Sequence, residues 1–341
     1  MLLSTTATLA ESYDLALVDL DGVAYRGPEP IEHAAESLTA ARATGLGLLF
    51  VTNNASREPE AVAEQLSGLG IAASADDVMT AAQAAAAVLA ERLAPGSKVL
   101  VVGGAGLYTA VRAKGFEVVS SAEDAPVAVV QGFAPDLSWR ELAEAAYAVQ
   151  RGAWHVASNL DMTLPNERGL APGNGSLVAV VRAATGVEPV SAGKPGPTMF
   201  RLAVERRSAE RPLVIGDRLD TDLAGARAAG YPGLHVLTGV SSARDAVLAP
   251  GSERPSYIGA DLRSLHEPHT APRPVDGGWW VCGDSAARAD DGTLELRPGG
   301  ESTPSSALDL VRAACGAAWA RADEGRPLAP ANVPELGVHT R

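Results

Sequence analysis

Short, fully apolar segments alternate along this chain with longer alanine-rich segments, and this alternation restricts the fold more than any other feature of the sequence. The apolar segments have the length of strands, and they occur at residues 15–18, 46–51, 99–102, 127–130, 154–157, 213–215 and 235–237. The alanine-rich segments show helical periodicity, at residues 34–43, 58–69, 81–93, 137–149 and 176–184. Fully apolar strands that alternate with helices are typical of parallel sheets covered on both faces. The sequence therefore predicts an α/β fold.

The composition limits the partners of the chain. Its 341 residues are 46% hydrophobic and 20% charged, which is ordinary for a globular protein and excludes wholesale disorder. The net charge of −13, without any run of Lys or Arg, argues against a nucleic-acid partner. No apolar stretch reaches the roughly 18 residues of a membrane span. Cys282 and Cys315 cannot form a disulfide framework and are expected to be reduced. We therefore expect a cytoplasmic protein without a membrane span.

The C-terminal part of the chain has a different character. Residues 266–278 contain three prolines and predict a linker. Beyond it, residues 279–282 and 293–296 predict a hairpin, and residues 305–322 predict a helix. One face of this helix is apolar, with Leu308, Val311, Cys315, Trp319 and Ala322. A hairpin and one helix are too small to fold alone, so we expect this face to dock on the rest of the chain or on a second subunit.

Polar clusters follow several of the predicted strands, where ligands bind in open parallel sheets. The first is Asp19-Leu20-Asp21-Gly22, directly after residues 15–18. Two carboxylates two residues apart can serve one reacting centre, and Gly22 allows the backbone to turn tightly and approach an anion. A simple Asp-Gly turn after a strand is the structural alternative.

Two further clusters offer hydrogen-bond donors and a cation for a phosphate. The segment Thr52-Asn53-Asn54-Ala55-Ser56 combines hydroxyls, two amides and an expected helix start, and helix capping is its structural alternative. Lys194 lies between a glycine and prolines in GKPGP at 193–197, and it is one of three lysines against 25 arginines. A compact ammonium suits a phosphoryl oxygen and a neighbouring aspartate.

The fourth cluster is rich in carboxylates. Residues 213–215 lead into GDRLDTD at 216–222, where Asp217 stands at the strand end. Its carboxylate is a hard oxygen ligand of the kind that Mg²⁺ prefers. Taken alone, these acids could be the acidic start of a helix. Four such clusters, each at a strand end or beside a turn, instead predict a site for a phosphate and a divalent metal.

The motifs resemble those of the haloacid dehalogenase (HAD) superfamily of phosphatases, in the subfamily IIA that carries an α/β cap of the C2 type. The resemblance rests on DLDGVAYRG at 19–27, VTNNASR at 51–57, LPNERGLAPGNGSL at 164–177, GKPGP at 193–197 and GDRLDTD at 216–222. It implies a Rossmann-like core of residues 1–80 and 189–265 with a cap inserted at 81–188. It also implies a small C-terminal α+β region at 275–325, likened to part of an acetyltransferase fold. That region lacks the R-x-x-G-x-G/A pattern of a pyrophosphate loop, which argues against acetyl-CoA binding.

The resemblance also implies a mechanism. Asp19 is the expected nucleophile that forms an aspartyl-phosphate, and Asp21 is the expected general acid and base. Mg²⁺ is the implied cofactor, held by Asp19, the backbone carbonyl of Asp21, and Asp217.

Other residues of the same motifs bind the phosphate or support the site in this reading. Thr52, Asn53 and Lys194 are expected to bind phosphoryl oxygens, with Lys194 counted among the catalytic residues. Gly22 supports the nucleophile turn, and Asp222 orients Lys194 or a water molecule at the metal. Residues 159–165 and 174–176 of the cap are candidates for contacts with the leaving group, and the sequence does not single one out.

The substrate implied by the resemblance is a small phosphorylated metabolite. The cap motif, GDRLDTD and YIGADLRSLH at 257–266 are most similar to those of D-glycerol 3-phosphate phosphatases. 2-Phosphoglycolate, pyridoxal phosphate and aryl phosphates are the alternative substrates. A dehalogenase or a phosphonate hydrolase would not need Asp21, and an inactive ligand sensor on the same fold stays open. The apolar faces of the cap and tail are compatible with a homodimer.

Overall fold

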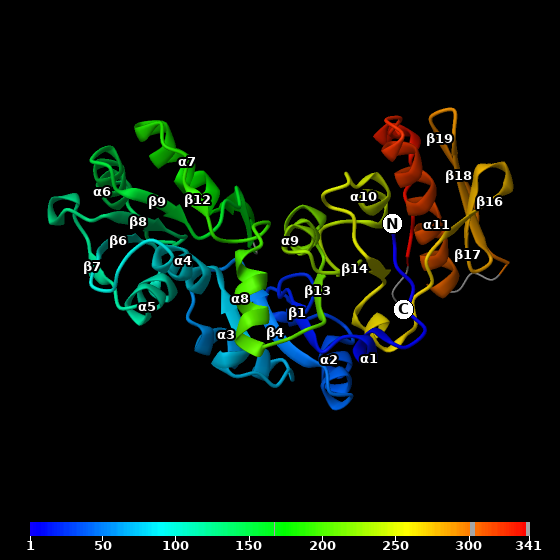
Figure 1. Ribbon diagram of the computed structural model, residues 1–341, viewed down its shortest axis with the longest axis horizontal. Coiled ribbons are helices and arrows are strands. Elements are labelled where there is room, and N and C mark those ends of the chain that lie inside the picture. Colours follow the sequence, from blue (N-terminus) through cyan, green and yellow to red (C-terminus); the bar gives the residue numbers. More distant parts are fainter. Residues whose placement is uncertain (167, 301–303, 339–341) are drawn as a thin grey trace. The chain divides into compact units, whose positions relative to one another are not determined.

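The computed structural model describes residues 1–166, 168–300 and 304–338. The chain divides into two compact units (Figure 1). The first unit comprises Met1–Leu48 and Arg207–Arg341, and the second comprises Leu49–Arg206. Each unit contains a parallel sheet, which confirms the predicted α/β class.

The sheet of the first unit brings two of the predicted polar clusters to one edge. Its parallel strands β1 (Leu15–Val18), β13 (Pro212–Gly216), β14 (Gly233–Val236) and β15 (Tyr257–Gly259) lie in the order β15-β14-β13-β1. All of their residues are buried, as expected for strands covered on both faces. Val18 pairs with Ile215, so Asp19 and Asp217 both follow the carboxyl ends of adjacent strands.

Short helices accompany these strands in the first unit. They are α1 (Leu9–Ser12), α2 (Ala34–Ala43), α9 (Ala224–Ala229) and α10 (Ala243–Leu248). The segment α2 has the bounds that its alanine-rich pattern predicts. A π-helical turn at Leu219–Leu223 directly follows the end of β13 and carries Asp220 and Asp222.

The C-terminal region is a four-stranded antiparallel sheet with one helix. The strands β16 (Arg273–Val275), β17 (Trp279–Cys282), β18 (Ser285–Asp290) and β19 (Thr293–Arg297) pair in chain order. The predicted pairing of residues 279–282 with 293–296 is wrong, because β18 lies between these two strands. The sequence SAARAD of β18 has small and charged residues where an apolar alternation would have marked a strand. The predicted linker also contains β16.

The helix α11 (Pro304–Asp323) docks on the core of the first unit, as its apolar face predicts. Trp319 is 1% exposed, and its Nε1 donates to the carbonyl oxygen of Ala246 in α10 at 3.0 Å. The Arg254 guanidinium lies over the Trp319 ring and forms an ion pair with Asp323 at 2.7 Å. Figure 1 shows α11 along one face of β17–β19. The tail is therefore an integral part of the first unit.

The second unit contains a five-stranded parallel sheet in the order β12-β9-β8-β6-β7. Its strands are β6 (Lys98–Val102), β7 (Glu117–Val119), β8 (Ala128–Gln131), β9 (Trp154–Ala157) and β12 (Val190–Ser191). Helices α4 (Ala81–Ala90) and α5 (Ala105–Ala113) lie on one face, and α6 (Trp139–Gln150) and α7 (Asn174–Thr185) on the other (Figure 1). An antiparallel hairpin, β10 (Thr163–Asn166) with β11 (Gly169–Pro172), leads into α7.

Four further elements frame the residues of the second unit that are expected to bind phosphate. Strand β4 (Gly47–Thr52) pairs in parallel with β5 (Val78–Thr80), and α3 (Pro59–Gly68) lies between them in the chain. Helix α8 (Thr198–Arg207) follows the GKPGP segment. Across the described residues, the helices are too short or too polar to cross a membrane.

Candidate active site

Three carboxylates gather at the edge of the first unit's sheet. One oxygen each from Asp19, Asp217 and Asp222 lie within 4.8 Å of one another. The adjacent strands β1 and β13 position the first two, and the π-helical turn positions the third. Asp217 and Asp222 are 0% and 1% exposed, so the cluster concentrates negative charge where water is largely excluded. Asp222, expected to play a supporting role, lies in the cluster itself.

Asp217 is held tightly by the backbone around it. Its Oδ2 accepts from the Val240 amide at 2.7 Å, and its carbonyl oxygen accepts from the Ser241 amide at 3.1 Å. A Cβ atom added at Gly22 or Gly239 would lie 2.6 or 1.9 Å from Asp217 Oδ2. Side chains at either glycine would therefore displace the carboxylate. The close packing fixes where Asp217 presents its oxygens.

His235 supports the same segment from the buried side of the sheet. Its Nε2 lies 3.2 Å from the carbonyl oxygens of both Asp217 and Ser241. Burial lowers the pKa of His235 to about 4, so the ring is neutral near pH 7 and donates from Nε2. The sequence does not indicate this role, because a histidine inside an apolar strand resembles a core residue.

The turn after Asp19 brings Asp21 to the surface beside this cluster. Gly22 has φ +89°, a left-handed conformation that favours glycine, and its carbonyl oxygen accepts from Thr238 Oγ1 at 2.6 Å. Partial burial raises the pKa of Asp21, while the Gly27 amide and the Arg26 charge oppose this shift. A raised carboxyl pKa favours the protonated form that a general acid needs.

The carboxylate cluster fits a hard divalent cation. All three side chains offer oxygen ligands, which Mg²⁺ prefers over nitrogen or sulfur. The space beside Gly22 and Gly239 is filled by the Asp217 carboxylate. The surrounding backbone therefore holds this carboxylate in place before any ion binds. Three buried or half-buried carboxylates that close together repel one another unless a cation compensates them. The donor set therefore supports the predicted metal site.

The second unit collects the neutral and basic residues that were expected to bind phosphate. Asn53 Oδ1 accepts from the Lys194 amide at 2.9 Å, and Asn53 Nδ2 donates to the Lys194 carbonyl oxygen at 3.2 Å. Thr52 Oγ1 accepts from the Asn54 amide at 3.1 Å, which leaves its hydrogen as a donor. The Lys194 side chain is buried, and its Nζ lies 3.4 Å from the Val51 carbonyl oxygen. The structure thus joins Thr52, Asn53 and Lys194 into one local cluster.

The capping alternative for this segment holds for Asn54. Its Oδ1 accepts from the amides of Ser56 and Arg57 at 2.9 and 3.3 Å. Asn54 therefore stabilises the turn before α3.

Residues of the predicted cap, some of them from the cap motif at 164–177, contribute to the same cluster. Asn159 donates to the Asn53 carbonyl oxygen at 2.7 Å, and the Asp161 carboxylate accepts from Asn53 Nδ2 at 3.1 Å. Asn174 at the start of α7 donates to the Asn159 carbonyl oxygen at 2.7 Å. Glu167 of this motif lies outside the described residues. Sequence analysis placed residues 159–165 and 174–176 near the leaving group, and gave no sign of their bonds to Asn53.

Comparison with known proteins identifies the family. Residues 16–117 match a model of haloacid dehalogenase-like hydrolases, and residues 191–265 match a second model of HAD-like hydrolases. The chain is 48% identical to a D-glycerol 3-phosphate phosphatase of Mycobacterium tuberculosis, over 92% of this chain and 87% of the relative. The chain belongs to the haloacid dehalogenase-like hydrolases.

Two further relatives of this HAD-like hydrolase cover different shares of it. An acid sugar phosphatase of Staphylococcus saprophyticus is 37% identical over 75% of this chain and 97% of its own length. The crystal structure of a glycerol phosphate phosphatase from Mycobacterium tuberculosis, in complex with magnesium, is 46% identical with a TM-score of 0.85. That match covers 95% of this chain and 94% of the solved chain, so it extends over both units and the tail.

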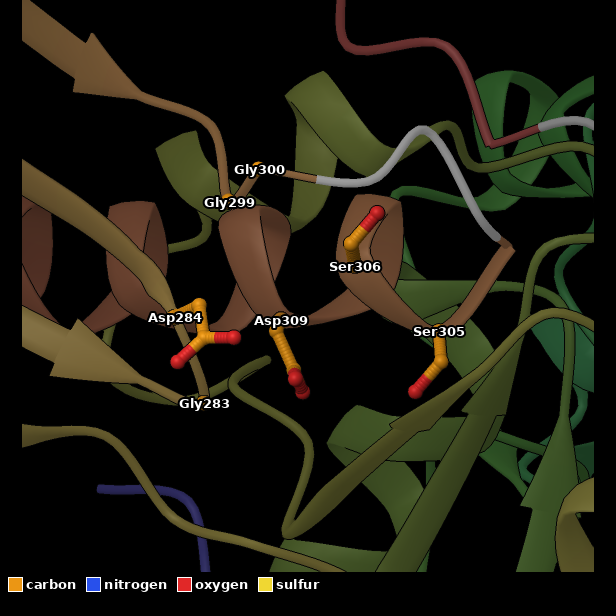
Figure 2. Close-up of a pocket in the computed structure, with 7 residues that line it drawn as sticks. All are labelled: Gly283, Asp284, Gly299, Gly300, Ser305, Ser306 and Asp309. Carbon is orange, nitrogen blue, oxygen red and sulfur yellow. The ribbon is translucent and has the colours of Figure 1, made fainter.

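The tail of this HAD-like hydrolase matches a third model, of a GCN5-related N-acetyltransferase-like domain, over residues 282–333. A cavity of about 360 Å³ opens here beside the first turn of α11. Figure 2 shows the Asp284 and Asp309 side chains at this cavity, with Ser305 and Ser306 on the helix. Two carboxylates repel a polyphosphate, so the lining does not suit the pyrophosphate of acetyl-CoA. This agrees with the missing pyrophosphate-loop pattern.

Proposed function

We propose that this chain is a Mg²⁺-dependent phosphomonoester hydrolase that converts glycerol 3-phosphate to glycerol and phosphate. The observation that carries the proposal is the cluster of Asp19, Asp217 and Asp222 at the ends of adjacent strands. A relative 48% identical over 92% of the chain is a D-glycerol 3-phosphate phosphatase, which supports the substrate. A related glycerol phosphate phosphatase crystallised with magnesium, which supports the metal.

The metal would be held by Asp19, the backbone carbonyl of Asp21, and Asp217, with Asp222 as a further carboxylate of the cluster. Mg²⁺ bound there would neutralise charge, so that a carboxylate can approach an anionic phosphate. Asp19 follows the buried strand β1, so its carboxylate is presented from a rigid position.

In the first proposed step, a carboxylate oxygen of Asp19 attacks phosphorus. A bond forms between that oxygen and phosphorus, and the bond from phosphorus to the ester oxygen breaks. The departing alkoxide is a strong base, and Asp21 gives it a proton. The raised pKa of Asp21 supports this role, because the carboxyl must be protonated when the ester bond breaks. The products of this step are the free alcohol and an aspartyl-phosphate on Asp19.

In the second step, the Asp21 carboxylate takes a proton from a water molecule, whose oxygen attacks the same phosphorus. The bond between Asp19 and phosphorus breaks, and its electron pair returns to the Asp19 carboxylate. Inorganic phosphate leaves, and Asp21 is protonated again for the next cycle. Each step balances without an oxidant or a reductant, and water is the co-reactant of the second step.

The residues of the second unit would bind the phosphoryl group in this scheme. Thr52 offers a hydroxyl hydrogen, Lys194 offers a positive charge, and Asn53 offers an N–H group. Asp222 would orient Lys194 or a water molecule. These assignments follow the motif positions that the sequence resemblance implies.

A screen of small phosphomonoesters with the purified chain and Mg²⁺ tests the proposal. We expect phosphate release from glycerol 3-phosphate at a higher kcat/KM than from 2-phosphoglycolate, pyridoxal phosphate or p-nitrophenyl phosphate. Asp19→Asn should abolish all of these activities. A higher kcat/KM for another ester would replace the substrate assignment. Tight substrate binding without turnover would favour the inactive sensor.

Three broader predictions accompany this function. We propose that residues 1–80 and 189–265 form the catalytic core, residues 81–188 the cap, and residues 275–325 a small C-terminal region. We also propose that the chain works in the cytoplasm, since Cys282 and Cys315 are free and buried. A homodimer stays a prediction, to be tested by light scattering.

A further inference from the structure

A closed ring of hydrogen bonds ties Asn53 to Asn159 and Asp161 within the second unit. Asn159 Nδ2 donates to the Asn53 carbonyl oxygen at 2.7 Å, although 106 positions separate them in the chain. The Asp161 amide donates to Asn159 Oδ1 at 3.2 Å. Asn53 Nδ2 donates to the Asp161 carboxylate at 3.1 Å and closes the ring. Three side chains therefore fix one another and the end of strand β4.

The ring leaves the Asn53 side chain no hydrogen to offer a phosphate. An amide group has two N–H donors. Asn53 Nδ2 donates one hydrogen to the Asp161 carboxylate and the other to the Lys194 carbonyl oxygen at 3.2 Å. Asn53 Oδ1 meanwhile accepts from the Lys194 amide at 2.9 Å. The side chain therefore clamps the Lys194 backbone to the end of β4, and the N–H that Asn53 would offer a phosphate is its main-chain one.

The surroundings hold the ring in place. Asn159 is 5% exposed and Asn174 is 2% exposed, and Asn174 Nδ2 donates to the Asn159 carbonyl oxygen at 2.7 Å. A Cβ atom on Gly193 would lie 2.5 Å from the Ser158 carbonyl oxygen and 3.0 Å from Asn159 Cβ. The chain before Lys194 therefore passes against the ring with no space for a side chain. Loss of one buried partner would leave other polar groups unsatisfied.

We propose that Asn159 and Asp161 are positioning residues for phosphate binding. They act through Asn53, which sets the backbone of Lys194 and the end of β4, and they do not contact the leaving group. This inference rests on the proposed function, in which Thr52, Asn53 and Lys194 bind the phosphoryl group. It gives Asn159 and Asp161 a role that is independent of which alcohol the substrate carries.

The test compares two substrates that carry the same phosphoryl group on different leaving groups. We expect Asn159→Ala and Asp161→Ala each to lower kcat/KM by about 10–100-fold, since small misplacements at a reacting centre have effects of this size. The loss should be equal for glycerol 3-phosphate and p-nitrophenyl phosphate. The inhibition constant of inorganic phosphate should rise in parallel. The two losses should not add in the double variant, because both residues belong to one ring.

Two controls separate positioning from general damage. Asp161→Asn keeps an acceptor oxygen for Asn53 Nδ2, so it should restore kcat/KM to within about fivefold of the wild type. Gln150→Ala removes an exposed amide of the same unit, which donates to the Ala184 carbonyl oxygen, and should leave all parameters unchanged. If Asn159→Ala does not fold, the comparison of Asp161→Ala with Asp161→Asn still tests the inference, because Asp161 is only half-buried.

Two results would overturn the inference. A loss confined to glycerol 3-phosphate would make these residues leaving-group contacts, and an unchanged inhibition constant for phosphate would remove their link to the phosphate site. A wild-type chain that hydrolysed neither ester would instead refute the proposed function. Calorimetric binding of inorganic phosphate to the same variants would then still decide whether the ring positions a phosphate site.

Discussion

The two units carry opposite kinds of polar cluster. In the first unit, Asp19, Asp217 and Asp222 bring three carboxylates within 4.8 Å, and a backbone amide and two glycines fix the position of Asp217. In the second unit, the side-chain amides of Asn53 and Asn159 bond to backbone groups and to the single carboxylate of Asp161, next to the buried Lys194. The first arrangement suits a cation and the second an anion. In the proposed mechanism, metal binding and phosphate binding therefore depend on different contacts, so each can be disrupted separately.

The largest effect is expected at Asp19. Asp19→Asn keeps the size of the side chain, yet an amide cannot attack phosphorus usefully, so kcat should fall by more than about a thousandfold. Steady-state phosphate release measures this. Asp220→Asn is the matched control, because Asp220 pairs with Arg218 at 2.7 Å instead of joining the cluster. Substantial activity in Asp19→Asn would show that another group is the nucleophile.

Substitution of Lys194 should give the next largest loss of activity. This loss should come without a change in the Mg²⁺ requirement. Lys194→Met removes the charge and keeps the buried apolar stem, so kcat/KM should fall by about 100–1000-fold. The Mg²⁺ concentration for half-maximal activity should change little, because the carboxylate cluster is intact. Lys114→Met, at an exposed lysine of the same unit, is the control. A variant that mainly needed more Mg²⁺ would contradict the separation of the two clusters.

Asp217 should show the reverse pattern. EDTA should abolish activity and Mg²⁺ should restore it, and Asp217→Ala should raise the half-maximal Mg²⁺ concentration by at least about tenfold. A Mg²⁺ titration of activity measures both effects, with Asp220→Ala as the control. Full activity of the wild type in chelator would rule out the metal assignment.

Truncation after Leu265 should affect stability far more than chemistry. The tail packs Trp319 against α10, whereas the carboxylate cluster lies on other elements. We expect kcat for small phosphomonoesters within about tenfold of the full chain, a barrier change below about 1.4 kcal/mol. The melting temperature should fall, since apolar surface of α10 becomes exposed. A stable, soluble truncation that had lost its chemistry would place the tail in the active site.

The tail also offers a single-residue test. Trp319→Ala should lower the free energy of unfolding by about 3–5 kcal/mol, as expected for a buried aromatic residue, and leave kcat nearly unchanged. Chemical denaturation and phosphate release measure the two quantities. An unchanged free energy of unfolding would contradict the packing of α11 on α10.

The last prediction on stability concerns acid, and it involves both units. Burial lowers the pKa of His155 in the second unit, and of His235 and His269 in the first, to about 4. As pH falls through 6.5 the unfolded chain binds protons at these residues, while the folded chain does not until about pH 4. The free energy of unfolding should therefore decrease between pH 6.5 and 4. Melting at pH 7 and 5 should show this, and His155→Gln should reduce the difference. Equal melting temperatures would contradict it.

The sequence predicted the apolar strands and the family well, for clear physical reasons. Strand β1 has the predicted bounds because every residue in it is buried and apolar. Strand β18 was missed because its SAARAD sequence carries small and charged residues. The bonds of Asp161 to Asn53 and of His235 to Asp217 were also missed. These bonds join residues that are distant in the chain, and no local pattern encodes them.

The stereochemical course at phosphorus tests the central claim most directly. Glycerol 3-phosphate analogues made chiral at phosphorus with sulfur and oxygen isotopes would be hydrolysed by the wild-type chain with Mg²⁺. Attack by Asp19 followed by attack of water involves two in-line displacements, each of which inverts the configuration. The account therefore predicts net retention in the phosphate product. Net inversion would mean that water attacks the ester directly, and would contradict the role of Asp19 as nucleophile.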